Sequence, residues 1–306
     1  MEGRIWSKLL SPSTRAFTRE ARNTPGFGFF DWLHGYVYAR WPYLYIGIGT
    51  GEHWVARRLG PILGWLSRLI PANETDNGSW VDGYHGKVMP LQAATQLVTI
   101  QQDINLGDLE QIIPYARARD IIMKHPDHIV ALECPCRSAR PDPCLPLDVC
   151  LIVGEPFAGF LREHHPQRSR WINAAEAVAV LQAEDERGHV HHAVFKDAML
   201  GRFYAICNCC ACCCGAMHAH RNGSPLLAAS GYISQVDPGL CTGCGTCADY
   251  CQFSALTAED DVAVVDADAC MGCGVCVFQC TQGALALVRD PAQGEPLEMH
   301  KLIAAQ

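Results

Sequence analysis

The sequence predicts an α+β protein, in which a cysteine-rich N-terminal α+β domain precedes a smaller C-terminal module with pseudo-twofold symmetry. Three observations indicate this class. Four cysteines in residues 241–251 recur in residues 270–280, each shifted by 29 positions, and such a repeat is typical of a duplicated structural unit. A capped helix pattern is followed directly by a strand pattern in residues 173–195. Short strand patterns also lie before and between the cysteine groups.

The first part of the chain, residues 1–90, is basic and rich in tryptophan. Residues 1–72 hold nine Lys and Arg against four Asp and Glu, and six of the seven tryptophans fall within the first 80 residues. This composition is typical of a segment that lies on a membrane surface or on a partner protein. The alternative is a helical arm that packs on its own domain.

The start of the chain also bears on where the protein resides. The sequence "MEGRIWSKLLSPSTRAF" lacks the apolar region and the cleavage site of a secretory signal. No apolar run reaches the roughly 18 residues that would span a bilayer. We therefore expect a cytoplasmic protein, peripheral to the inner face of the membrane if residues 1–72 bind lipid. Thiols in that reducing compartment are metal ligands or catalysts more often than disulfides.

Residues 91–230 are predicted to form the cysteine-rich α+β domain. Residues 108–125 have the apolar spacing of a helix. The segment "HIVALE" (128–133) has the pattern of a short buried strand, which delivers the chain to Cys134.

The most complete helix signal lies in "INAAEAVAVLQAEDERGHV". Asn173 can cap this helix, Glu176 completes a capping box, and Gly188 ends it. The following "HVHHAVF" alternates as a strand does. Further on, "LTAEDDVAVVDADAC" (256–270) predicts a strand, an acidic turn and a second strand.

The clearest motif is C-x2-C-x2-C-x3-C, which occurs as "CTGCGTCADYC" from Cys241 and as "CMGCGVCVFQC" from Cys270. Soft thiolate ligands favour iron–sulfur clusters or zinc. A zinc site would close with four local cysteines, whereas eight cysteines in two such runs fit two cubane clusters better. Two glycines in each run allow the tight loop that such a cluster requires. These glycines are Gly243, Gly245, Gly272 and Gly274.

Residues 232–290 resemble the bacterial-type ferredoxins with two [4Fe-4S] clusters. The resemblance implies that the fourth cysteine of each run ligates the cluster of the other run. One implied ligand set is Cys241, Cys244, Cys247 and Cys280, and the other is Cys270, Cys273, Cys276 and Cys251. The sequence departs from the family where Gln252 and Thr281 replace the proline that usually follows the fourth cysteine. We expect a module over residues 231–290 and a tail over residues 291–306.

Ten further cysteines lie upstream of this module. The first group is Cys134, Cys136, Cys144 and Cys150, and the second is Cys207, Cys209, Cys210, Cys212, Cys213 and Cys214. Neither group has ferredoxin spacing, and the prolines beside the first group predict an irregular loop. The side chains of residues 207–214 cannot all converge on one centre. Some must ligate one site, some a second site, and some merely pack.

Three hypotheses remain for these ten thiols. They ligate one or two additional iron–sulfur clusters, they bind structural zinc, or they are reactive or simply buried cysteines. We favour the first hypothesis because a ferredoxin module in the same chain implies iron–sulfur loading and a route for electrons. Residues 130–290 also resemble a wider group of ferredoxin-fused proteins, which supports this architecture and a redox role.

The sequence supports three functional hypotheses. The first is an iron–sulfur electron-transfer protein, a subunit that relays single electrons between a redox enzyme and a second partner. The second is an oxidoreductase that reduces a substrate at an unusual upstream cluster. The third is a zinc-binding scaffold or regulatory protein with a ferredoxin module. No nucleotide-binding, zinc-protease or serine-hydrolase motif is present, and the net charge of −8 gives no indication of nucleic-acid binding.

Overall fold

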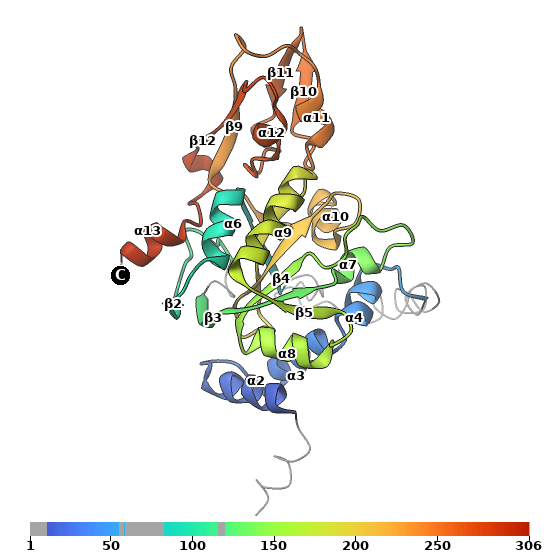
Figure 1. The fold of residues 1–306 in the computed structure, drawn as a ribbon, viewed down its shortest axis with the longest axis vertical. Helices are drawn as coiled ribbons and strands as arrows, with labels where there is room; N and C mark the ends of the chain where they lie inside the picture. The colour runs from blue at the N-terminus through green and yellow to red at the C-terminus, as the bar shows by residue number, and fades with distance from the viewer. Residues whose placement is uncertain (1–10, 55–57, 59–82, 116–119, 306) are drawn as a thin grey trace, which may run out of the picture.

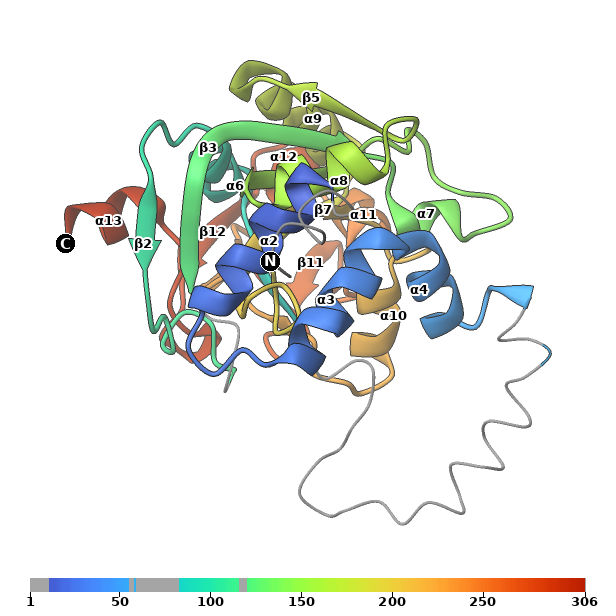
Figure 2. The same ribbon diagram turned by 90° about the horizontal axis from the view of Figure 1, so that it is seen from below.

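A computed structural model describes residues 11–54, 58, 83–115 and 120–305 of the chain (Figure 1). The described part begins with three helices, α2 (Pro12–Asn23), α3 (Phe29–Arg40) and α4 (Pro42–Gly49). The side chain of Ser11 caps α2 by accepting a hydrogen bond from the backbone N–H of Thr14. Figures 1 and 2 show α2 and α3 at the end of the molecule opposite to the C-terminal module.

A large curled sheet of eight strands forms the centre of the molecule. Its order is β2-β3-β4-β7-β6-β1-β8, and β5 pairs with β3. All these pairings are antiparallel except that of β1 with β8. The strands are β1 (Tyr84–Met89), β2 (Ile104–Leu106), β3 (Ile121–Leu132), β4 (Cys150–Glu155), β5 (Ser169–Ile172), β6 (Val190–Lys196), β7 (Arg202–Cys209) and β8 (Leu227–Ala228).

The two faces of this sheet carry separate apolar cores. Helices α6 (Leu91–Val98) and α9 (Ala174–Glu186) cover one face with small and aliphatic side chains. Helix α8 (Phe157–His164) covers the other face together with α2 and α3. The sheet is therefore the middle of three layers, which is how a sheet with two apolar faces excludes water from both. Two short helices, α7 (Pro135–Ser138) and α10 (Gly215–Arg221), follow cysteine segments.

The C-terminal module projects from one end of the sheet domain (Figure 1). It contains two antiparallel strand pairs, β9 with β12 and β10 with β11. Its elements are β9 (Tyr232–Val236), α11 (Thr246–Tyr250), β10 (Leu256–Glu259), β11 (Val262–Val265), α12 (Val275–Gln279) and β12 (Leu285–Arg289). The chain then continues through η1 (Pro291–Gln293) and α13 (Met299–Ala304), and Met299 is buried in the core beneath α6.

The α+β class, the α9 helix and the strands at β6, β10 and β11 are confirmed. Both halves of the predicted capping box are present, since Asn173 accepts from the Glu176 N–H and Glu176 accepts from the Asn173 N–H. The helix predicted over residues 108–125 is wrong in the described part, because residues from Ile121 onward belong to β3. Ile121, Ile122 and Met123 of that segment pair with β2, and Lys124 pairs with β4. The β-branched isoleucines suit a pleated strand surface.

The described part of the basic segment packs on the sheet domain. Phe17 is 1% exposed and Ala39 is 3% exposed, both within the core under α8. Residues 84–89 form an inner strand of the large sheet between β6 and β8. Residues 1–10, 55–57 and 59–72 lie outside the described residues. Within the described part, no helix combines the length and the apolar character that crossing a bilayer requires.

Candidate metal centres

The eighteen cysteines of the chain fall into three spatial groups, and all of them are free thiols. Eight lie in the C-terminal module, in a first run from Cys241 to Cys251 and a second run from Cys270 to Cys280. Four more gather where two loops meet, and the remaining six line a cavity. Each group offers a different spacing of sulfur atoms, and this spacing decides what each could hold.

In the module, the structure brings the two runs together. A small cavity is lined by the first three cysteines of the first run and by Cys280 of the second. In the second set, the thiols of Cys273 and Cys276 both lie close enough to Cys270 to interact with it electrostatically. They interact in the same way with Cys251 of the first run. These neighbourhoods are the two ligand sets that the resemblance implies. Ligation itself stays a prediction.

Backbone amides in the module point at sulfur atoms. The N–H of Ala255 donates to Cys251 Sγ at 3.2 Å, and the N–H of Ala284 donates to Cys280 Sγ at 3.3 Å. A third bond runs from Ala263 to Cys241 Sγ at 3.4 Å. Such donors stabilise the negative charge of thiolates around an iron–sulfur core. The thiols, their amide donors and the small cavity therefore fit a thiolate-bound cluster.

Steric crowding explains why both cysteine runs contain glycine at equivalent positions. Gly272 has a φ of +62°, and a Cβ atom there would lie 2.0 Å from the carbonyl oxygen of Tyr232. Gly243, its equivalent in the first run, has a φ of +63° and would place a Cβ 2.5 Å from the carbonyl oxygen of Asp261. Both positions exclude any other residue, because the backbone conformation and the close approach of a second chain segment require glycine.

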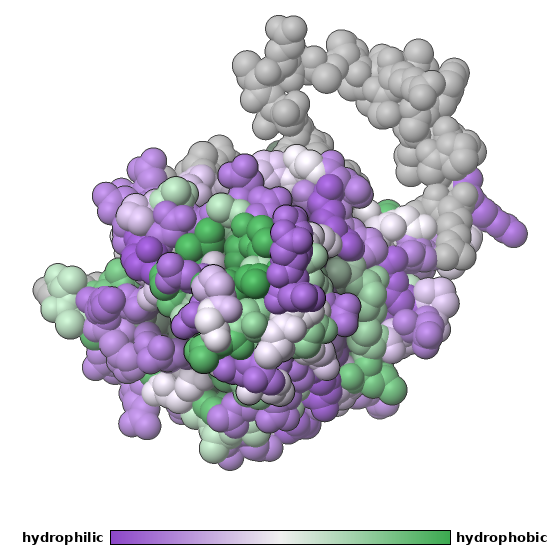
Figure 3. All heavy atoms as spheres, turned by 90° about the horizontal axis from the view of Figure 1, so that it is seen from above, coloured by the Kyte–Doolittle hydropathy of each residue, from purple (hydrophilic) through white to green (hydrophobic). Residues whose placement is uncertain are grey.

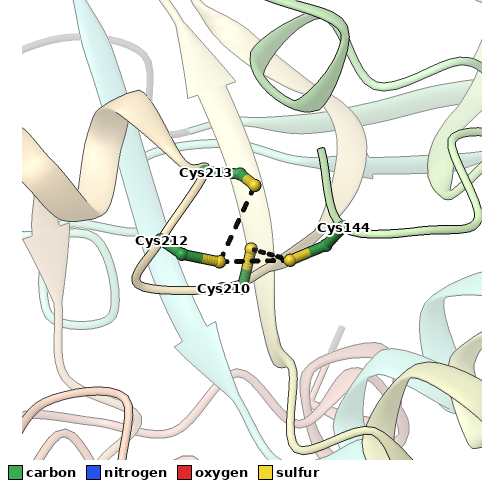
Figure 4. Close-up of side chains that lie close together, drawn as sticks. All are labelled: Cys144, Cys210, Cys212 and Cys213. Atoms are coloured by element: carbon green, nitrogen blue, oxygen red, sulfur yellow. Dashed lines mark hydrogen bonds between the residues drawn. The ribbon is translucent and has the colours of Figure 1, made fainter. Parts of the chain in front are cut away.

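A four-thiol group lies beyond the C-terminal end of β7, where the loop after β7 meets the loop after α7 (Figure 4). The sulfur atoms of Cys144 and Cys212 are 3.1 Å apart, and Cys210 Sγ lies 3.7 Å from Cys144 Sγ. Cys213 Sγ is 3.7 Å from Cys212 Sγ, and all four sulfurs lie within 4.8 Å of one another. A tetrahedral ion with metal–sulfur bonds of about 2.3 Å places its ligands about 3.8 Å apart. This group could therefore hold one metal ion.

The other six upstream cysteines form a closed six-thiol ring. Going round the ring, each thiol interacts with the next, in the order Cys134, Cys136, Cys214, Cys209, Cys207 and Cys150, and Cys150 returns to Cys134. Strand geometry places three of the six ring thiols. Cys207 and Cys209 are two residues apart on β7 and share a face, and the neighbouring strand β4 begins at Cys150.

The ring thiols differ in acidity because of their neighbours. Hydrogen bonds from Cys150 and Cys209 lower the pKa of Cys207 to about 5. Hydrogen bonds from Cys136 and Cys209 likewise lower the pKa of Cys214 to about 5. The same contacts raise the pKa of the donor Cys209. The pKa values of Cys134, Cys136 and Cys150 are raised as well. The ring therefore favours the thiolate form at Cys207 and Cys214 and the thiol form at its other members.

A buried arginine fixes the segments that supply these thiols. Arg137 follows the Cys134–Cys136 segment, is 1% exposed, and donates to the Glu184 carboxylate on α9 at 2.5 Å. It also donates to the carbonyl oxygens of Pro146 at 2.6 Å and Asn208 at 3.0 Å. One side chain therefore ties the α7 segment to α9 and β7. A charge at this depth is tolerated only when it is paired and hydrogen-bonded.

A cavity of about 540 Å³ opens beside the ring, and all six ring thiols border it. None of the cysteines of the four-thiol group does. Its other walls are largely apolar and aromatic, and include Tyr38, Tyr45 and the end of Lys196. The Lys196 ammonium lies 4.9 Å from the Tyr38 ring centroid. Burial lowers the pKa of Lys196 to about 8, although Asp197 opposes the shift.

The module docks on the sheet domain next to both upstream groups. Gln252 accepts a hydrogen bond from the N–H of Ala211 at 2.7 Å and donates to the Gly188 carbonyl at 2.9 Å. Ala211 lies between the cysteines of the four-thiol group. Gln252 stands where the ferredoxins that the module resembles carry proline, so this departure supplies one of the docking contacts. The sequence marks the position as unusual but does not reveal its partner.

A comparison with protein families agrees with this reading of the C-terminal module. A family model described as "4Fe-4S binding domain" matches residues 234–257 and 263–286, one match for each cysteine run. No curated protein matches the chain. The C-terminal part therefore carries two 4Fe-4S binding motifs, and motifs of this kind serve electron transfer.

Proposed function

We propose, starting from the two 4Fe-4S binding motifs, that this protein relays single electrons between a redox enzyme and a second partner. Two [4Fe-4S] clusters in the C-terminal module and one or two further metal centres in the cysteine-rich domain would form the relay. A bound cluster of this kind takes up and releases one electron within its thiolate cage. Cys241, Cys244, Cys247 and Cys280 would hold one cluster, and Cys270, Cys273, Cys276 and Cys251 the other.

One observation carries this proposal. Cys273 of the second run packs in the same apolar cluster as Cys209 and Cys214 of the six-thiol ring. Met271 and Val275 fill the space between the module and the sheet domain in that cluster, and both are buried. A relay needs its centres close together and shielded from water. This packing supports a path from the module into the cysteine-rich domain.

The two runs differ in exposure, which gives the relay an outer and an inner end. Cys244 of the first run is exposed, whereas Cys270 and Cys276 of the second run are buried. Figure 3 looks down on the module end, where hydrophobic side chains gather among hydrophilic ones. Leu240 and Phe278 of the module are 51% and 55% exposed. A small apolar surface with a polar rim suits a transient redox partner.

The N-terminal helices supply a second surface, for which we propose a membrane as the partner. Phe29 is 65% exposed, Phe30 is 82% exposed, and Trp41 is 45% exposed. They belong to a segment of net positive charge, with nine basic and four acidic residues in 1–72. Exposed aromatic residues beside basic ones are typical of helices that lie on anionic lipid. This surface is at the end of the molecule opposite to the module.

A second candidate function, an oxidoreductase, is favoured by the cavity. The 540 Å³ cavity borders all six ring thiols, as well as a buried lysine and four tyrosines. Sites for small molecules are concave and largely apolar, with a few polar groups. A substrate reduced there would receive electrons from the module. Turnover of small oxidants by the loaded protein would separate this function from that of a carrier.

The zinc hypothesis now applies most directly to the four-thiol group. Its close sulfur spacing fits one tetrahedral ion, and four thiolates bind either zinc or iron in this geometry. Zinc there would be structural, because it has no redox chemistry. Zinc content of the purified protein tests this point.

The experiment for the proposed relay is metal and acid-labile sulfide analysis of anaerobically purified protein, with electron paramagnetic resonance of the reduced state. We expect at least about eight irons per chain, the content of two cubanes. Cys270→Ala should remove about four of these irons and leave upstream metal in place. Fewer than about four irons in the wild type, or loss of all metal in a folded Cys270→Ala protein, would contradict the proposal.

A further inference from the structure

The six-thiol ring draws its members from four separate places in the sequence. Cys134 and Cys136 flank the start of α7, Cys150 begins β4, Cys207 and Cys209 end β7, and Cys214 precedes α10. Arg137 ties the first of these segments to the Cys207–Cys209 segment by donating to the carbonyl oxygen of Asn208. The side chain of Asn208 in turn donates to the carbonyl oxygen of Val149, the residue before Cys150. We propose that this ring binds one polynuclear iron–sulfur cluster, a face of which is open to the 540 Å³ cavity. The inference deepens the proposed function and rests on it, because electrons would reach the ring from the module.

The donor chemistry of the ring favours a metal cluster over ordinary core packing. Six soft sulfur donors face one cavity, and four of them are buried. Backbone N–H groups also interact with ring sulfurs, from Arg137 to Cys134, from Gly215 to Cys136 and from Met217 to Cys214. Amides directed at thiolates are also found in the C-terminal module, where they accompany the 4Fe-4S binding motifs.

The spacing of the ring separates it from a single-ion site. Among the described residues, the one set of three or more cysteines whose sulfurs all lie within 4.8 Å of one another is the four-thiol group, and the ring contributes no such set. A single tetrahedral ion needs ligands about 3.8 Å apart. Thiolates that bind different irons of one cluster lie farther apart, around its inorganic core. Six cysteines also exceed the four that a [2Fe-2S] or [4Fe-4S] cluster takes.

The position of the ring explains why the cluster would be useful. On one side, Cys209 and Cys214 pack in the apolar cluster that contains Cys273. On the other side, the cavity extends past the ring to Tyr45 and Lys196. The ring therefore lies between the electron-transfer module and a space large enough for a small molecule. The four-thiol group borders neither the cavity nor that apolar cluster.

The test compares two double variants in full-length protein purified anaerobically. We expect about twelve irons or more in the wild type, the content of two cubanes and a further cluster of at least four irons. The ring variant Cys150→Ser with Cys207→Ser should lose the irons above about eight or nine. The matched control Cys144→Ser with Cys212→Ser should lose one metal ion and keep the remaining iron and sulfide.

The outcomes distinguish failure of the ring cluster from failure of the proposed function. A folded ring variant with wild-type iron and sulfide, or a wild type with about eight irons, overturns the ring cluster while the relay in the module stands. A wild type without the paired clusters in its reduced-state spectrum overturns the proposed function itself. If the double variant does not fold, the partly exposed Cys136→Ser replaces it, and Mössbauer spectra of iron-57 protein must show a third cluster that this substitution alters.

Discussion

Gly272 shows how strictly a single residue can be specified. Its φ of +62° and the carbonyl oxygen of Tyr232 at 2.0 Å from a Cβ leave no room for alanine. The second run of cysteines begins two residues before it. The C-x2-C-x2-C-x3-C spacing therefore predicts the glycine, but the segment that crowds it, the start of β9, becomes visible only in the fold.

Replacing Gly272 by alanine should destabilise the module by roughly 2 to 4 kcal/mol, through left-handed backbone strain and the clash with Tyr232. We expect loss of about four irons, measured per chain. The matched control is Gly283→Ala. Gly283 also has a positive φ of +63°, but nothing lies within 4 Å of its Cβ position. If Gly272→Ala keeps full iron and the control's melting temperature, the steric argument fails.

The buried Lys196 predicts how the stability of the folded protein depends on pH. Burial lowers its pKa from 10.5 to about 8, so at pH 7 the folded protein holds a buried ammonium at a cost of up to about 3 kcal/mol. Lys196→Met should therefore raise the melting temperature at pH 7. Between about pH 8 and 10.5 the unfolded chain holds a proton on Lys196 that the folded chain has lost, so the stability of the wild type rises with pH. The difference in stability between Lys196→Met and the wild type therefore shrinks over this range, and we call this difference the gap.

Thermal unfolding followed by circular dichroism at pH 7, 8.5 and 10 measures this gap. A difference between Lys196→Met and wild type that stays constant over this range would show that the ammonium is not the source. A less stable variant at pH 7 would show that the contacts with Tyr38 and Tyr45 outweigh the cost of desolvation.

At the scale of elements, helices and strands that depend on neighbouring residues could be predicted from the sequence, whereas pairings between distant segments could not. The capping box at Asn173 and Glu176 predicts α9 because both partners lie three residues apart. The apolar spacing of residues 108–125 matches a helix, but pairing with β2 and β4 makes its later part a strand. Tertiary pairing overrides a local pattern of this kind.

The candidate metal centres were likewise predictable where the ligands are close in sequence, and not where they come from distant segments. The eight module cysteines are recognisable from spacing alone. The dense stretch 207–214 had to serve more than one centre, and the structure divides it between the six-thiol ring and the four-thiol group. A period of two on β7 could have indicated that Cys207 and Cys209 share a face. The partners of both groups, Cys144 and Cys150, depend on loop and strand contacts that no local pattern contains.

Gln252 tests the docking of the module as an element. Gln252→Ala should remove the hydrogen bonds to Ala211 and Gly188 and leave two partly buried backbone groups without these partners. We expect faster hydrogen exchange in the loop of residues 209–214, with unchanged iron content. Gln282→Ala is the control, because Gln282 contacts only the Thr281 hydroxyl at 3.5 Å among the interactions described for it. Equal exchange in both variants would show that the docking does not depend on Gln252.

At the scale of the whole molecule, two working ends are separated by the sheet domain. The module lies at one end and the exposed aromatic residues of α3 at the other (Figure 1). Between them lie the ring, its cavity and the four-thiol group. A protein on a membrane through α3 would thus present its module away from the lipid, toward a redox partner.

Phe29→Ser with Phe30→Ser should weaken binding to anionic vesicles by about tenfold or more, since burying one phenylalanine contributes about 1.5 to 3 kcal/mol. Point substitutions are preferable to deletion of residues 1–72, because Phe17 belongs to the core. Phe278→Ser, 55% exposed on the module, is the control and should bind normally. Vesicle co-sedimentation measures the effect, and equal binding by all three proteins would contradict a membrane role for α3.

The most direct test of the relay is the rate at which upstream metal is reduced by an external one-electron donor. Rapid-freeze electron paramagnetic resonance would follow the upstream signal in wild type and in Cys270→Ala. The relay predicts that the upstream centre is reduced quickly in the wild type, and much more slowly once the second-run cluster is lost. Equal rates in the two proteins, with the variant folded and its upstream metal present, would contradict a path through the module.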